Sequence, residues 1–115
     1  MDKFLKHYLV TALWSSNDDD GTPFDRDHEI EDFSEEAIEK AKKDCESFKE
    51  KAGITLDRYS ETSCGHDFWL TRNGHGAGFW DGDYGDEDGE KLTEISKEFP
   101  NVYVVKGDDG KLYIE

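Results

Sequence analysis

One stretch of the chain, residues 66–81, concentrates side chains that could do chemistry. It reads His-Asp-Phe-Trp-Leu-Thr-Arg-Asn-Gly-His-Gly-Ala-Gly-Phe-Trp-Asp, so sixteen positions hold two His, two Trp, two Phe, one Arg, two Asp and three Gly. Imidazole and carboxylate groups can transfer protons or bind a transition metal. Tryptophan and arginine are the side chains that dominate binding hot spots. We therefore expect any specific function to involve this stretch.

An enzymatic interpretation would use a histidine of this stretch as general acid or base. His66 or His75 would move the proton, Asp67 would orient the imidazole, and Cys64 would be the nucleophile. However, the partners of a Cys-His pair usually converge from distant positions, and no G-x-S-x-G, P-loop or H-E-x-x-H motif is present. We therefore assign no catalytic residue. Enzymatic activity stays open, and a non-enzymatic role is preferred.

A metal site is the second chemical interpretation. His66, Asp67, His75 and Asp81 supply the imidazole and carboxylate ligands that suit zinc, manganese or iron. The eight residues between the two histidines match no specific metal signature, and a structural zinc site requires four close ligands. We therefore expect no cofactor. A divalent metal is the alternative, with His66 and His75 as its candidate ligands.

A recognition surface is the preferred interpretation of the stretch. In a strand, Asp67, Trp69 and Thr71 would lie on one face, with Phe68, Leu70 and Arg72 on the other. The alternative is a purely structural role, in which the rings form the core of an aromatic-rich small domain. The side chains expected to bind a partner are Asp67, Trp69, Arg72, Asn73, His75, Trp80, Asp81 and Asp83.

Helices are predicted on either side of the stretch from apolar spacing. Residues 3–15 have the spacing of an amphipathic helix, although a strand is the alternative over residues 8–14. Residues 34–52 form the clearest helix, since Ser34 is a good N-cap and Gly53 a good stop. Residues 90–99 are predicted to form a third helix that ends at Pro100.

Hairpins are predicted from alternation and turn residues. Asn73-Gly74 is a strong turn signal between strands at residues 67–72 and 79–80, and residues 82–89 are expected to form an acidic loop. A second hairpin would join residues 102–105 to 111–114. The predicted fold class is therefore α+β, with two or three helices packed on a small antiparallel sheet of hairpins containing three to five strands.

Length and charge limit the function further. The 115 residues indicate a single domain over residues 1–115, with an extended acidic loop at residues 17–33. The net charge of −15 lies in two blocks, residues 17–36 and 81–90, whose acidic residues far outnumber the single base between them. This charge argues against direct binding to nucleic acid and favours a protein with a basic surface or divalent cations. Solubility alone is the alternative explanation.

The sequence contains few features typical of membrane insertion, secretion or disulfide bonding. No apolar run approaches the roughly 18 residues that a membrane span needs, and the charged residues among the first ten argue against a signal peptide. Cys45 and Cys64 are the only cysteines, without a metal-finger spacing. We expect a cytoplasmic protein with reduced thiols and no membrane contact, and the sequence leaves its oligomeric state open.

Residues 66–81 resemble a block found in an uncharacterised family of small proteins encoded by tailed bacteriophages. The resemblance extends to Ala-Leu-Trp-Ser-Ser followed by acids near residues 12–20, to the helix around Asp44, Cys45 and Phe48, and to Gly-Asp-Asp-Gly-Lys-Leu-Tyr at residues 107–113. It implies a bacteriophage origin and a location in the cytoplasm of the infected bacterial host, and it brings no established activity.

The expected function combines these observations. It is that of a small acidic accessory protein that binds a host or phage protein, one form being inhibition of nucleic-acid-acting machinery by charge mimicry. The alternative is a metal-binding protein or a small metal-dependent enzyme that uses the block at residues 66–81.

Overall fold

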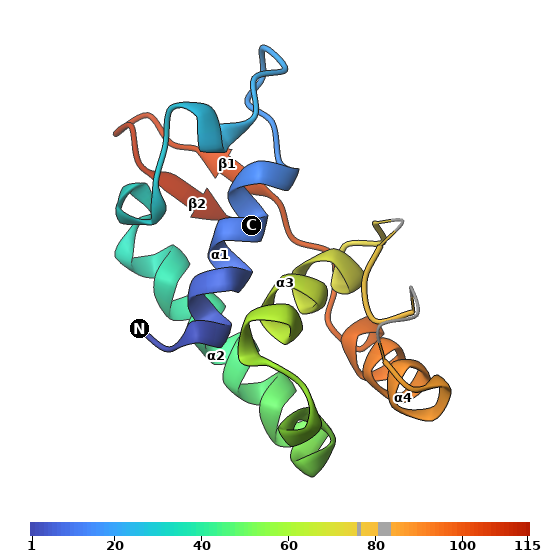
Figure 1. The fold of residues 1–115 in the computed structure, drawn as a ribbon. Helices are drawn as coiled ribbons and strands as arrows, with labels where there is room; N and C mark the ends of the chain where they lie inside the picture. Colours follow the sequence, from blue (N-terminus) through green and yellow to red (C-terminus); the bar gives the residue numbers. More distant parts are fainter. Residues whose placement is uncertain (76, 81–83) are drawn as a thin grey trace.

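The computed structural model describes residues 1–75, 77–80 and 84–115. Four α-helices and a two-stranded antiparallel sheet make up the described part, which confirms the expected α+β class (Figure 1). The elements are α1 (Lys3–Ser15), α2 (Glu35–Ala52), α3 (Glu61–Arg72), α4 (Asp86–Lys97), β1 (Val104–Lys106) and β2 (Leu112–Ile114), with short 3-10 turns at Phe24–Arg26, Ile30–Asp32 and Gly53–Arg58. Asp81 and Asp83, two of the expected binding residues, lie outside the described residues.

The first two helices form where the sequence predicts them, and the strand alternative for residues 8–14 is wrong. The Asp2 side chain accepts a hydrogen bond from the Leu5 amide at the start of α1, a standard N-cap contact. Ser34 does the same for α2 by accepting from the Ala37 amide. Gly53 ends α2 with a φ of +59°, a conformation that favours glycine.

The prediction of a hairpin at residues 67–80 is wrong, because residues 61–72 form the helix α3. Ser60 caps this helix by accepting a hydrogen bond from the Ser63 amide. Eight of its twelve residues are buried, on most sides of the helix. A helix buried in this way has no clear amphipathic period, so its short apolar run could also be read as a strand. Asn73-Gly74 forms the helix end, where Gly74 has a φ of +70°.

The third predicted helix is confirmed but begins earlier than expected. α4 starts at Asp86, so residues 86–89 are helical and not part of an acidic loop. Asp86, Glu87 and Asp88 lie in the first turn, where carboxylates interact favourably with the helix dipole. Gly89 lies inside α4, at a point where a Cβ would come within 2.7 Å of the Phe79 carbonyl oxygen. The lack of a side chain at this position therefore allows residue 79 to pack closely against the helix.

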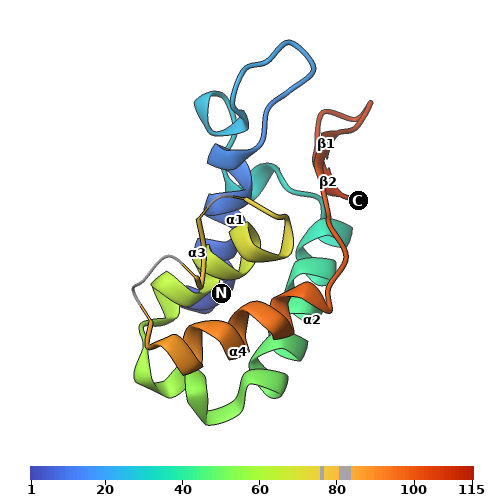
Figure 2. The same ribbon diagram turned by 90° about the vertical axis from the view of Figure 1, so that its right-hand side faces the viewer.

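The C-terminal hairpin is confirmed, although the described residues contain two strands where three to five were expected. β1 pairs with β2 in the register Val104↔Ile114, Val105↔Tyr113 and Lys106↔Leu112. The hairpin is tied to the start of α2, because the Ser34 amide donates to the Leu112 carbonyl at 2.8 Å. The sheet is thus a small hairpin at the side of the helices and not a layer on which the helices pack (Figure 2).

Aromatic side chains from α1, α2 and α3 form the core. Phe48 of α2 stacks on Phe68 of α3 with ring centroids 4.2 Å apart, and Phe4 and Tyr8 of α1 pack against Phe68. α4 lies across α2 and α3, as Figure 2 shows. Burial of such large rings compensates for the low aliphatic content.

The acidic loop at residues 17–33 is held at both ends. Asn17 pairs with Pro23 in an isolated bridge, and the buried rings of Phe24 and Phe33 anchor the segment to the core. Figures 1 and 2 both place this loop at one end of the molecule, away from the acidic start of α4. The described parts of the two acidic blocks are therefore separate surfaces. Among residues 1–75, 77–80 and 84–115, none of the helices combines the length and apolar character that a bilayer crossing requires.

Candidate functional site

Asp67 lies inside the protein at the centre of a polar cluster. Its Oδ2 accepts a hydrogen bond from the Tyr84 hydroxyl at 2.7 Å, and its Oδ1 lies 2.9 Å from Nδ1 of His66. Burial, and then the hydrogen bond to Asp67, raise the pKa of Tyr84 above its ordinary value of 10.0. The carboxylate therefore ties α3 to the segment before α4, while the half-exposed His66 ring stacks on Trp14.

Arg72 is also an interior side chain. Its guanidinium donates to Asp44 Oδ2 at 2.7 Å, to the Tyr8 hydroxyl at 3.1 Å and, through two nitrogens, to the Pro100 carbonyl. It thereby links α3 to α1, α2 and the segment after α4. A buried guanidinium requires such partners, because an unpaired charge inside a protein is costly.

Trp69 and Asn73 also connect α3 to neighbouring segments through hydrogen bonds. Trp69 is 1% exposed, and its Nε1 donates to Ser15 Oγ of α1 at 2.9 Å. The Asn73 side chain donates to the Trp69 carbonyl and accepts from the Val102 amide. Asp67, Trp69 and Arg72 therefore belong to the interior of the fold. For residues 67–72, the alternative that the aromatic rings form the core matches the structure.

A polar hollow of about 320 Å³ lies above Trp69 and Asn73. It is formed where the end of α1, the end of α3 and the segment before β1 meet. Half-buried His75 lines it, together with Ser16, Asn17, Asn101 and Tyr103. The structure thus brings Trp69, Asn73 and His75 to one place, and of these three only His75 has a side chain without a hydrogen-bond partner among the described residues.

Trp80 lines a second groove and is the most exposed of the expected binding residues in the described part of the chain. Its side chain is 44% exposed. The groove has a volume of about 370 Å³ and runs beside α4, where Asp86, Glu90 and Glu94 also line it. We call this the acidic groove. Positions four apart share one face of a helix, so the three carboxylates form a row with a spacing of about 6 Å.

Among the described residues, no ion pair within 4 Å joins Asp86, Glu90 or Glu94 to a cation. The ion pairs around α4 join Asp88 to Arg58 and Glu98 to Lys51, and neither involves the groove. The groove also contains Lys97, at its far end. Its charge therefore changes along α4, from carboxylates at Asp86, Glu90 and Glu94 to the ammonium of Lys97 at the end of the helix.

Comparisons with known proteins give no relative. No protein-family model, curated protein or solved structure matches the chain. We therefore infer the function from the geometry of the polar hollow and the acidic groove, and from the charged residues around them.

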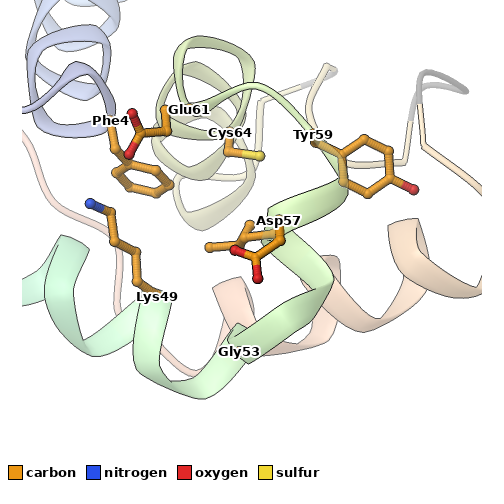
Figure 3. Close-up of a pocket in the computed structure, with 8 residues that line it drawn as sticks. Phe4, Lys49, Gly53, Asp57, Tyr59, Glu61 and Cys64 are labelled. Carbon is orange, nitrogen blue, oxygen red and sulfur yellow. The ribbon is translucent and has the colours of Figure 1, made fainter.

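A third cavity, of about 370 Å³, bears on the enzymatic interpretation (Figure 3). Cys64 faces it from α3 and Phe4 from α1, while Lys49 and Asp57 approach from α2 and the turn that follows. Burial raises the pKa of the Cys64 thiol to about 11, so the thiol is protonated at neutral pH. A protonated thiol is a poor nucleophile, which argues against Cys64 in that role.

The metal interpretation gains little from the described residues. Over residues 1–75, 77–80 and 84–115, no three His, Cys, Asp or Glu side chains gather closely enough to hold an ion together. His66 contacts Asp67, whereas His75 lies in the polar hollow, and Asp81 is outside the described residues. The two candidate ligands therefore belong to different surroundings.

Sequence reasoning missed the carboxylate row of the acidic groove. Asp86 was assigned to a glycine-rich loop and Glu90 to the beginning of a helix, which separates residues that share one helix face. The four-residue spacing of Asp86, Glu90 and Glu94 was the available signal. It was hidden because Gly85 and Gly89 favour a loop prediction.

Proposed function

We propose that this chain is a small acidic binding protein whose acidic groove takes a basic segment of a protein partner. Trp80 would contact an arginine or lysine side chain through its ring face, and Asp86, Glu90 and Glu94 would pair with neighbouring positive charges. Cation–π contacts are strongest with tryptophan, and carboxylates pair well with guanidinium groups.

The observation that carries the proposal is a row of three carboxylates that form no close ion pair within the described residues and that line one groove with an exposed tryptophan. Like charges four residues apart destabilise a helix by about 0.2–0.5 kcal/mol for each pair. α4 nevertheless places Asp86, Glu90 and Glu94 at this spacing, and among the described residues none of the three forms an ion pair within 4 Å; the cation that lines the same groove is Lys97, one turn beyond Glu94. A bound basic segment would remove the repulsion, which favours association over the free state.

The charge of the whole chain supports the same kind of partner. A net charge of −15 accelerates encounter with a basic surface and repels a phosphate backbone. Lys97 at the far end of the groove would disfavour a cation there. The partner's basic residues are therefore expected toward the start of α4, where Asp86 and Glu90 lie.

The biological setting is part of the proposal. The resemblance to phage proteins suggests a host or phage partner in the cytoplasm of an infected bacterium. A basic cleft that normally binds nucleic acid would suit the groove, so inhibition of nucleic-acid-acting machinery by charge mimicry is the form we favour. A row of carboxylates on a helix supports this form better than acids in a loop, because the helix fixes their spacing.

The test uses a labelled peptide rich in arginine and lysine as probe. We expect it to shift the indole N–H signal of Trp80 in a two-dimensional NMR spectrum and to bind more weakly as salt is raised. Trp80→Ala should raise the Kd about tenfold through loss of the cation–π contact. Glu90→Gln and Glu94→Gln should each raise it by a smaller factor.

Two matched variants serve as controls. Trp14 is 43% exposed, so Trp14→Ala removes an equally exposed ring outside the groove. Glu31→Gln removes an exposed charge in the acidic loop. Both should leave the Kd nearly unchanged. Equal losses from Trp14→Ala and Trp80→Ala would show only general attraction and would contradict the proposal. Charge mimicry additionally requires that the chain release a labelled oligonucleotide from the same peptide.

A metal function is the second candidate, for one geometric reason. Asp67 holds Nδ1 of His66 at 2.9 Å and leaves Nε2 of the half-exposed ring for a ligand. Carboxylate contacts of this kind orient many metal-binding histidines. Elemental analysis of protein purified without a histidine tag tests this function. A stoichiometric metal lost in His66→Ala would support it, and protein free of metal would contradict it.

A further inference from the structure

The polar hollow differs from the rest of the surface in its charge. Charged residues make up 37% of the chain, yet among residues 1–75, 77–80 and 84–115 no Asp, Glu, Lys or Arg side chain lines the hollow. Its polar groups are instead hydroxyls, amides and an imidazole. Its volume of about 320 Å³ lies within the range of small-molecule sites.

The floor of the hollow is fixed by hydrogen bonds within the protein. Trp69 Nε1 donates to Ser15 Oγ, which in turn donates to the Thr11 carbonyl. Asn73 uses both ends of its side-chain amide, one on the Trp69 carbonyl and one on the Val102 amide. A ligand would therefore meet a floor that is already ordered, which lowers the entropic cost of binding.

The rim of the hollow, in contrast, has unused hydrogen-bonding capacity. In the part of the chain that the structure describes, the side chains of Ser16, Asn17, His75, Asn101 and Tyr103 have no hydrogen-bond partner. Hydroxyl, amide and neutral imidazole groups can each donate and accept. They match a ligand whose own groups do both, which is the property of an alcohol hydroxyl.

Tyr103 contributes an exposed aromatic side chain on an anchored backbone to the rim. Its side chain is 65% exposed, but its backbone exchanges two hydrogen bonds with Glu115, at 2.7 and 2.9 Å. Val102 and Val104 on either side point into the core. The ring is therefore exposed by the pleat of an anchored segment and not by a loose loop. One open ring face suits the C–H face of a sugar ring, since aromatic rings pack on apolar surfaces.

We propose that the polar hollow binds a neutral saccharide unit, with its hydroxyls on the Asn17, Asn101 and His75 side chains and its apolar face on Tyr103. Neutrality follows from the lining, because its described residues offer no cation to an anionic ligand and no carboxylate to a cationic one. Phosphorylated sugars and nucleotides are further disfavoured by the net charge of the chain. This site is separate from the acidic groove and does not depend on the function proposed for it.

The experiment uses methyl glycosides of glucose, galactose, mannose and N-acetylglucosamine as probes on the full chain. Binding is followed by NMR through the side-chain amide signals of Asn17 and Asn101 and the indole signal of Trp69. We expect at least one glycoside to shift these signals at saturable concentrations. Tyr103→Ala and Asn101→Ala change exposed side chains and should each raise the Kd about fivefold or more.

Controls separate this proposal from the alternatives. Trp80→Ala should leave the glycoside affinity unchanged, and glucose 6-phosphate should bind more weakly than methyl glucoside. The proposal is overturned if no glycoside shifts the rim signals, if the shifts map outside the hollow, or if neutral nucleosides bind and glycosides do not. Folding of each variant is checked by circular dichroism, and Asn17→Ala provides a further rim variant.

Discussion

The Arg72 guanidinium and the Asp44 carboxylate form an ion pair between α3 and α2, with Nη1 and Oδ2 2.7 Å apart. The Arg72 side chain is almost completely buried, whereas Asp44 is partly exposed to water. The two ends of the pair therefore differ in what their loss would cost. Arg72 depends on its protein partners, while Asp44 can be hydrated.

Loss of the Arg72 side chain should destabilise the fold strongly. Arg72→Met leaves the Pro100 carbonyl and the Tyr8 hydroxyl without their donor, so we expect the free energy of unfolding to fall by about 3 kcal/mol. Arg72→Lys should recover only part of this loss, because an ammonium cannot reach all the acceptors at once. Urea unfolding at neutral pH measures both variants. A loss below about 1 kcal/mol for Arg72→Met would contradict this role.

Gly65 should tolerate no side chain. A Cβ at this position would overlap the Phe4 carbonyl oxygen, a backbone atom that cannot move aside without shifting α1. We expect Gly65→Ala to cost about 3 kcal/mol of stability through overpacking. Gly85→Ala is the packing control, because its Cβ would find its nearest neighbour at 3.9 Å. Gly85 is the N-cap of α4, where alanine is less favourable than glycine, so that variant should lose only about 1 kcal/mol. Comparable losses in both would refute close α1–α3 packing as the cause.

Stability should fall at alkaline pH. Burial raises the pKa of Cys64 to about 11 and raises the pKa of Tyr8 and Tyr84 above their ordinary value. The unfolded chain therefore loses these protons first, so the stabilisation is complete below about pH 9 and is lost as the pH rises through the folded pKa values. Urea midpoints between about pH 7 and pH 11 measure this loss. Tyr84→Phe should be less stable at neutral pH but show a shallower alkaline decline, and an unchanged slope would count against Tyr84.

The two thiols should react slowly in the folded protein. Cys45 and Cys64 are both buried, and burial raises the pKa of each. A protonated, inaccessible thiol reacts poorly with a disulfide reagent. We expect slow labelling at about pH 8 in buffer and rapid labelling of both thiols in urea. Cys45→Ala isolates Cys64, and rapid labelling of that single thiol in buffer would revive it as a candidate nucleophile.

Local signals account for the parts of the fold that the sequence predicted well. Ser34 and Gly53 bound α2 because capping is a local hydrogen-bonding requirement. The turn at residues 107–110 similarly determines the β1–β2 hairpin, with Gly110 at a φ of +83°. Neither feature depends on what the rest of the chain does.

Tertiary contacts account for the parts that could not be predicted. α3 is buried on most sides, so its sequence shows no polar face, and its Asn73-Gly74 end resembles a hairpin turn. Of the expected binding residues, Trp80 and His75 line surface hollows, whereas Asp67, Trp69 and Arg72 are engaged inside. Residue type draws attention to this region, but only the fold decides which side of a helix each residue faces.

The packing of α1 on α3 has a consequence for how fast the chain can fold. The hydrogen bond between Tyr8 and Arg72 spans 64 positions in the chain, and all of α2 lies between the two helices that it joins. Forming contacts between positions so far apart in the chain costs loop-closure entropy before the contacts stabilise the fold. We therefore expect this chain to refold more slowly than a helical bundle of its size in which successive helices are neighbours.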